Sequence, residues 1–169
     1  MNVWKLGGRR TKNFLGLISI GGVRSRREFV KSMVLLIDAN IILNYLMNRN
    51  PGFEEARKIM DFCRRDDIHG YVAFHTVSII WYVLRRKPQE ERRRLLLDIC
   101  ELLTVTGALH KDVIDAILDD DFSDFEDCLQ VKCAENIFAD YIVTENINDY
   151  SKSSIPAVTA VELIKVLEI

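Results

Sequence analysis

Short apolar runs alternate with longer amphipathic segments through most of this 169-residue chain. Three runs rich in aliphatic, β-branched or aromatic residues predict buried β-strands, at 34–37, 70–74 and 141–144. Apolar positions at helical spacing predict α-helices between and after these strands, at 40–49, 53–67, 75–87, 89–103, 111–120, 124–139 and from 159 onward. Residues 104–107 and 156–158 are further candidate strands. The alternation predicts an α/β sandwich built around a parallel sheet.

Two of the predicted helices carry start signals. Thr76 is a candidate N-cap for the helix after the second strand, and Thr159 with Glu162 has the spacing of a capping box. In the helix at 124–139, a stripe of apolar residues is expected to pack on the sheet: Phe125, Cys128, Leu129, Cys133 and Ile137.

The first apolar run ends in an acid, Asp38, which is followed closely by Asn40. In open α/β sheets, ligands bind outside the carboxyl ends of the strands, so Asp38 stands where chemistry usually occurs. The alternative is that Asp38 only caps the helix that follows it. We favour a chemical role, because a Ser or Thr would cap that helix equally well.

Acids gather again before and at the start of the helix at 124–139. Asp124 and Asp127 are three residues apart, so on a helix they project from one side near its amino end. Asp121 continues this spacing, but we interpret residues 119–121 as a solvated acidic turn. For Asp124 and Asp127 we favour metal binding over a purely electrostatic role at the helix start.

A third polar cluster, formed by Glu145, Asn146 and Asp149, follows the strand at 141–144 and should converge with the other acids at one sheet edge. Clustered carboxylates repel each other by roughly 4 kcal/mol per pair at about 4 Å and an effective dielectric of about 20, so a positive group must offset them. Carboxylate oxygens suit Mg²⁺ or Mn²⁺, and such ions activate water for phosphodiester hydrolysis.

Composition and charge divide the chain at Met33. Hydrophobic residues make up 49% and charged residues 28%, which fits one globular domain over residues 33–169. Residues 1–32 carry eight Lys or Arg and one Glu, a formal charge of +7, whereas the remainder carries −9. We interpret 1–32 as a basic extension that is disordered or not native, with Met33 as the natural start.

The extension resembles neither a signal peptide nor a membrane span, because glycines interrupt its apolar run and basic residues stand where cleavage would occur. The four cysteines lack metal-site pairing and disulfide density, so reduced, buried thiols are expected. These observations predict a cytoplasmic protein that does not contact the membrane.

Three stretches together resemble the PIN-domain family, particularly the ribonucleases related to VapC-type toxins: LLIDANIIL, DFEDCLQVKCA and ADYIVTENINDY. The resemblance covers nearly all of 33–169. It implies a three-layer α/β/α sandwich with a short parallel sheet and Mg²⁺- or Mn²⁺-dependent endoribonuclease activity on RNA. It also implies dimerisation, here a homodimer, and inhibition by a small antitoxin protein. The metal-binding residues it implies are Asp38, Asp127 and Asp124, with Asp149 or Asn146 in the last place.

The chain departs from the family pattern at two positions. Many PIN nucleases have Glu, and one subgroup has Asn, where this chain places Ile79, which cannot bind a metal. Ser78, His75 or Thr76 are nearby substitutes, although a satisfied histidine and a helix cap are the plainer interpretations of the last two. Asn146 stands where several relatives have Asp. The alternative function is therefore a catalytically degenerate PIN-fold module that binds RNA or a protein partner.

Basic residues at 85–87 and 92–94 are candidates for a phosphate path beside the acids, although a solvated helix face is the plainer interpretation. We expect Trp81 and Tyr82 to be core or interface residues, since no RNA-binding motif with interleaved aromatics is present. A phosphoacceptor receiver is less favoured, because that class has paired acids on its first strand and a lysine after a late strand, and Lys152 comes too late.

Overall fold

The computed structural model describes residues 32–120, 122 and 124–168. The predicted basic extension therefore lies outside the described residues except for Ser32, and so does Asp121. The expectations made for these positions are not addressed by the structure.

The described residues form a parallel five-stranded sheet with the order β3-β2-β1-β4-β5. The strands are β1 (Met33–Ile37), β2 (Ile68–Ala73), β3 (Thr104–Thr106), β4 (Tyr141–Val143) and β5 (Ala157–Val158). All the predicted strands, including the two further candidates, are present. Because the chain moves outward from β1 in one direction to β2 and in the other to β4, the topological switch point lies between β1 and β4, where α/β sheets usually bind ligands.

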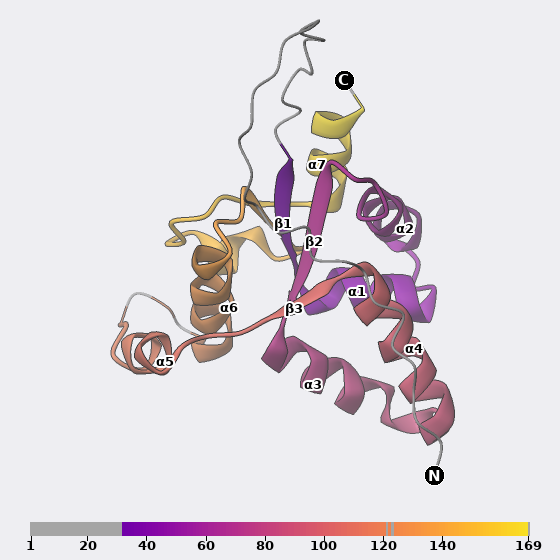
Figure 1. Ribbon diagram of the computed structural model, residues 1–169, viewed down its shortest axis with the longest axis horizontal. Coiled ribbons are helices and arrows are strands. Elements are labelled where there is room, and N and C mark those ends of the chain that lie inside the picture. Colours follow the sequence, from indigo (N-terminus) through magenta and orange to yellow (C-terminus); the bar gives the residue numbers. More distant parts are fainter. Residues whose placement is uncertain (1–31, 121, 123, 169) are drawn as a thin grey trace, which may run out of the picture.

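Helices cover both faces of this sheet (Figure 1). They are α1 (Ala39–Met47), α2 (Phe53–Phe62), α3 (Phe74–Val83), α4 (Gln89–Leu102), α5 (His110–Ile117), α6 (Phe125–Asn136) and α7 (Ala160–Leu167), with short 3₁₀ turns η1 (Leu84–Arg86) and η2 (Ile147–Tyr150). Residues of α1, α2, α3, α4 and α7 pack into one buried cluster, and residues of α6 and η2 pack into another. The predicted three-layer α/β/α sandwich is confirmed.

Strand β1 separates the two cores because successive side chains of a strand point to opposite faces. Leu35 and Ile37 join the cluster of α1, α2 and α7, whereas Leu36 joins the cluster of α6. All three side chains are fully buried. Burial on both faces explains the continuous apolar run in the sequence, and it holds the end of β1 rigidly in place.

Three local expectations were wrong and one was confirmed. Cys100 is exposed, although buried thiols were expected. Thr76 is not the N-cap of α3, since Ala73 occupies that position and Thr76 lies buried inside the helix. Phe125 does not pack on the sheet, because it opens α6 and is 47% exposed. Thr159 and Glu162 form the expected capping box at the start of α7.

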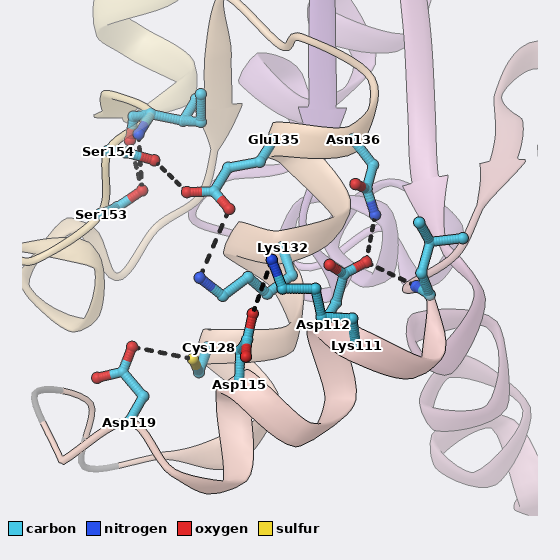
Figure 2. A network of polar contacts seen from close by, with 12 residues as sticks. Lys111, Asp112, Asp115, Asp119, Cys128, Lys132, Glu135, Asn136, Ser153 and Ser154 are labelled. Carbon is cyan, nitrogen blue, oxygen red and sulfur yellow. Dashed lines mark hydrogen bonds and ion pairs between the residues drawn. The ribbon is translucent and has the colours of Figure 1, made fainter.

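Helix α5 is attached to α6 by a set of polar contacts (Figure 2). Asp112 accepts hydrogen bonds from the side chain of Asn136 at 2.7 Å and from the backbone N–H of Leu109 at 2.6 Å. Just after α5, Asp119 accepts a hydrogen bond from Sγ of Cys128 on α6 at 3.8 Å. The contacts of Asn136 and Cys128 fix the inner side of α5 and leave its opposite side exposed.

Among the described residues, no helix has the length and apolar character needed to cross a membrane.

Candidate functional site

Asp38 lies at the carboxyl end of β1, beside the switch point of the sheet. It has extended backbone angles and serves as the N-cap of α1, with its own N–H donating to the carbonyl of Val143 at the end of β4 at 3.0 Å. Asp38 is therefore a helix cap, as the alternative interpretation of the sequence proposed. However, the carboxylate has further partners that a cap does not require.

Four donors from three parts of the chain surround the Asp38 carboxylate. Oδ1 accepts from the backbone N–H of Ala39 at 2.5 Å and from Nε2 of Gln130 at 3.4 Å. Oδ2 accepts from Oγ1 of Thr144 at 2.7 Å and from Nδ2 of Asn40 at 2.8 Å. Burial nevertheless raises the pKa of Asp38 above its ordinary value, against the opposing effect of these donors.

Asp124 and Asp127 lie together at the amino end of α6, as predicted. Asp124 is the N-cap and accepts from the backbone N–H of Glu126 at 2.7 Å. Burial raises the pKa of Asp127 to about 6, a hydrogen bond from Tyr150 opposes the increase, and the charges of Asp124, Asp149 and Asp38 add to it. The acids predicted from three separate stretches are thus close enough to influence one another electrostatically.

The last predicted pair, Asp149 and Asn146, is placed less uniformly. Asp149 lies in η2 with an exposed side chain, and its charge raises the pKa of both Asp38 and Asp127. Asn146 joins the network through its backbone, whose N–H donates to Oγ1 of Thr144 at 3.0 Å. The structure therefore brings the Asp149 charge to the site, whereas among the described residues the Asn146 side chain forms no hydrogen bond with these acids.

The structure adds residues that the sequence analysis did not assign to the site. Glu126 is one, because the charges of Asp38, Asp127 and Asp124 raise its pKa, after burial as the largest cause. Neutral donors are the others: Thr144 and Gln130 at Asp38, and Tyr150 at Asp127. No signal in the sequence marks Gln130, because its burial in α6 follows from tertiary packing.

The donor chemistry of this site fits a hard divalent cation. In the described part of the chain, Asp38, Asp124, Asp127 and Asp149 form no salt bridge, and their mutual repulsion favours a bound cation. As placed, though, no three His, Cys, Asp or Glu side chains of the described residues surround a common point closely enough to hold an ion. The side chains are of the type that binds such an ion and lie near one another, but among the described residues no three of them surround a common point.

The residues around Ile79 do not supply a replacement acid. Ile79 is half-buried on α3, one turn after Thr76, and Ser78 is exposed. The Nε2 atom of His75 is buried without a hydrogen-bond partner among the described residues, whereas its imidazole ring interacts with the side chain of Gln130. Thr76 instead donates to Oε1 of Gln130 at 3.2 Å.

Several of the basic residues considered for a phosphate path have local partners on α3 and α4. The guanidinium of Arg92 stacks on Trp81 at 4.1 Å, and that of Arg85 lies 4.3 Å from the centre of the Tyr82 ring. Lys87 pairs with Glu91 at 2.6 Å. These contacts hold the three side chains against α3 and α4, and the Nε atom of Arg92 is buried without a hydrogen-bond partner among the described residues, so they give no support for a phosphate path.

A hollow of about 690 Å³ lies away from the acids. Its lining includes Arg65 and His69 near the start of β2, and Asp98 and Glu101 on α4. It approaches the amino end of β2, whereas the acids lie beyond the carboxyl ends of β1 and β4. We therefore place the candidate site at the acids and not in this hollow.

The fold and site define a parallel α/β domain with an acidic centre at its switch point. A family model described as PIN domain matches residues 34–148, and the chain belongs to this family. PIN domains are generally nucleases and typically use divalent metals. Among curated protein sequences, none matches the chain.

Solved structures of low sequence identity share the fold. The chain is similar to VapBC-1 from nontypeable Haemophilus influenzae, with 15% identity, a TM-score of 0.58 and coverage of 76% of this chain and 99% of that one. VapBC2 from Rickettsia felis, bound to a DNA fragment from its promoter, gives 13% identity, a TM-score of 0.55 and coverage of 75% and 98%. PAE2754 from Pyrobaculum aerophilum gives 15% identity, a TM-score of 0.54 and coverage of 80% of this chain and 96% of that one.

Proposed function

We propose that this PIN domain is a metal-dependent endoribonuclease that hydrolyses RNA phosphodiester bonds. The observation that carries the proposal is the convergence of four acids, Asp38, Asp124, Asp127 and Asp149, at the switch point of the sheet. Acids at this place with few compensating charges suit a site for a divalent ion and a phosphate backbone.

In this proposal Mg²⁺ or Mn²⁺ is held by Asp38, Asp124 and Asp127, with Asp149 or Asn146 completing the set. A divalent ion in such a site supplies an activated water and neutralises charge on the phosphate. The residues of the chain orient these ligands. Thr144 and its neighbouring donors hold the Asp38 carboxylate in one direction, and Tyr150 donates to Asp127.

Burial and the charges of the neighbouring acids raise the pKa of Asp127, so a bound cation would favour its ionised form. Asp38, with four chain donors around it, is suited to a fixed role as ligand. We therefore assign both acids, together with Asp124, to the catalytic centre.

We further propose two protein partners, in a cytoplasmic setting. The structural neighbours include VapBC complexes, which supports a small antitoxin as a partner of this chain. A homodimer is supported by the outer side of α5, where Ile114, Ile117 and Leu118 lie one helical turn apart and are 42%, 61% and 72% exposed. A twofold interface brings one patch against its own copy, and two such stripes would cover each other's apolar side chains. Light scattering should give the mass of a dimer.

Residues 33–169 form the proposed PIN domain, with 1–32 as a separate basic extension. The family match begins at residue 34, next to the predicted boundary, which supports this division.

The nuclease proposal is tested by incubating the protein with RNA and Mn²⁺. We expect cleavage by the unchanged protein and its loss in Asp38→Asn, which keeps the size of the side chain but removes its charge. Asp98→Asn is the matched control, since Asp98 is exposed on α4 away from the acids. Equal cleavage by the unchanged protein and Asp38→Asn would contradict the proposal.

The second candidate function is a degenerate PIN module that binds RNA or a protein without cleaving RNA. The apolar Ile79 on α3, a helix that contains no acid, favours this alternative. Binding of RNA without cleavage, unaffected by Mn²⁺, would support it over the nuclease.

A further inference from the structure

A buried amide lies between the candidate site and the core. Gln130 is on α6, one turn after Asp127, and only 2% of it is exposed. Its neighbours in the helix, Val131 and Cys133, belong to the apolar core. Burying an amide among apolar groups costs free energy unless both of its ends are hydrogen-bonded.

Both ends of this amide have partners. Nε2 donates to Oδ1 of Asp38 at 3.4 Å, and Oε1 accepts from Oγ1 of Thr76 at 3.2 Å. The orientation follows from chemistry, because an ionised carboxylate can only accept, so the NH₂ group must face Asp38. The oxygen then faces Thr76, whose hydroxyl donates to it, and His75 interacts with the same amide.

This arrangement joins three elements through one side chain. Thr76 is fully buried in α3, Gln130 belongs to α6, and Asp38 ends β1. Asp127 lies on the same side of α6 as Gln130, since the two are three residues apart. A change at Gln130 would therefore alter the placement of Asp38 relative to the acids of α6.

We propose that Gln130 is a positioning residue that fixes the Asp38 carboxylate, and that Thr76 fixes Gln130. The proposal rests on the nuclease function for its effect on the reaction, but the hydrogen bonds that join Thr76, Gln130 and Asp38 are a property of the folded chain. Removing a partner that orients a site ligand typically lowers activity by about 10–100-fold. The effect should fall on kcat and not on KM, because Gln130 is buried and cannot contact RNA.

The kinetic test compares Gln130→Met, which keeps the length of the side chain but removes the amide, with Gln89→Met at the other glutamine, which is exposed on α4. We expect Gln130→Met to lower kcat about tenfold with KM within about twofold, and Gln89→Met to change neither. Thr76→Val, which removes the hydroxyl, should lower kcat. Thr76→Ser, which keeps the hydroxyl, should leave kcat close to that of the unchanged protein. A fall in kcat no larger than the loss of folded protein, or equal activity of Thr76→Val and Thr76→Ser, would overturn the proposal.

A second measurement does not depend on cleavage. The side-chain NH₂ signals of Gln130 and Gln89 are distinguished by NMR in the folded protein. We expect Asp38→Asn and Thr76→Val each to shift the Gln130 signals and leave those of Gln89 in place. Unshifted Gln130 signals in Asp38→Asn would overturn the proposed contact between Gln130 and Asp38. Shifted signals in a protein that cleaves no RNA would support this contact and contradict the nuclease function.

Discussion

Asp38 and Asp127 belong to one acidic site but are held in different ways. Four donors from α1, α6 and the end of β4 surround the Asp38 carboxylate. Asp127 receives a hydrogen bond from Tyr150 and faces the charges of Asp124, Asp149 and Asp38. The chain thus fixes one carboxylate and leaves the other in a surplus of negative charge.

The difference separates two properties that a metal site needs. Asp38 supplies a ligand of fixed orientation, because donors of the chain hold its carboxylate. Attraction for a cation comes from the acids of α6, whose repulsion a cation would relieve. Removing a donor of the Asp38 carboxylate should lower the free energy of unfolding, whereas removing one of the repelling charges should raise it.

The largest effect on this comparison is expected from Thr144→Val. Thr144 is fully buried, and its hydroxyl donates to Asp38 while accepting from Nδ2 of Asn40 and from the backbone N–H of Asn146. The valine leaves a carboxylate and two N–H donors without this partner, so we expect a loss of about 2–3 kcal/mol in the free energy of unfolding. Thermal unfolding should show a midpoint about 5–10 °C lower.

The matched control is Thr106→Val at the end of β3. Its hydroxyl has no hydrogen bond among the described residues, and its side chain is half-buried. This variant should unfold within about 2 °C of the unchanged protein. A Thr144→Val midpoint as high as that of the control would show that the donors around Asp38 add no stability.

An opposite effect is expected from Asp127→Asn. The pKa of Asp127 in the folded protein is about 6, above its ordinary value of 3.8, so the ionised carboxylate destabilises the fold. Stability present below the ordinary value is lost as the pH rises through about 6, and asparagine does not undergo this loss. We expect Asp127→Asn to be more stable by about 1 kcal/mol at pH 7.5, since solvent screens part of the effect.

The measurement is denaturant unfolding in EDTA at pH 7.5 and pH 3.5. The advantage of Asp127→Asn should be present at the higher pH and absent at the lower one. Asp98→Asn, on the exposed side of α4, should show no advantage at either pH. An advantage that is equal at both pH values would mean that charge at Asp127 is not its cause.

The fold was largely predictable because its signals are local. A strand buried on both faces needs an unbroken apolar run, and β1 and β4 have one. The acids were predictable for a related reason, since each follows a strand or begins a helix. The three local errors, at Thr76, Phe125 and Cys100, all depended on tertiary packing, which set whether each side chain was buried.

The neutral donors of the site were not predictable in the same way. Gln130 and Tyr150 contact acids that are 92 and 23 residues away in the sequence, so no local spacing relates them to the site. Each has an ordinary structural interpretation, Gln130 as a helix residue and Tyr150 as a core aromatic. Only the packing of α6 and η2 against the end of β1 gives them their partners.

The smallest effect is expected from Tyr150→Phe, which tests whether the hydrogen bond that Asp127 receives from Tyr150 matters. Tyr150 is 4% exposed, and its hydrogen bond lowers the pKa of Asp127 against the effects of burial and charge. Removing the hydroxyl should raise that pKa above about 6, while the free energy of unfolding falls by only about 0.5 kcal/mol because Asp127 remains half in solvent. The pKa is read from the side-chain carboxyl carbon of Asp127 by NMR titration in EDTA. Tyr82→Phe, at an exposed tyrosine of α3, should leave it unchanged. An unchanged or lower pKa of Asp127 in Tyr150→Phe would mean that the chain does not hold this carboxylate at all, and that burial and its acidic neighbours alone set its charge.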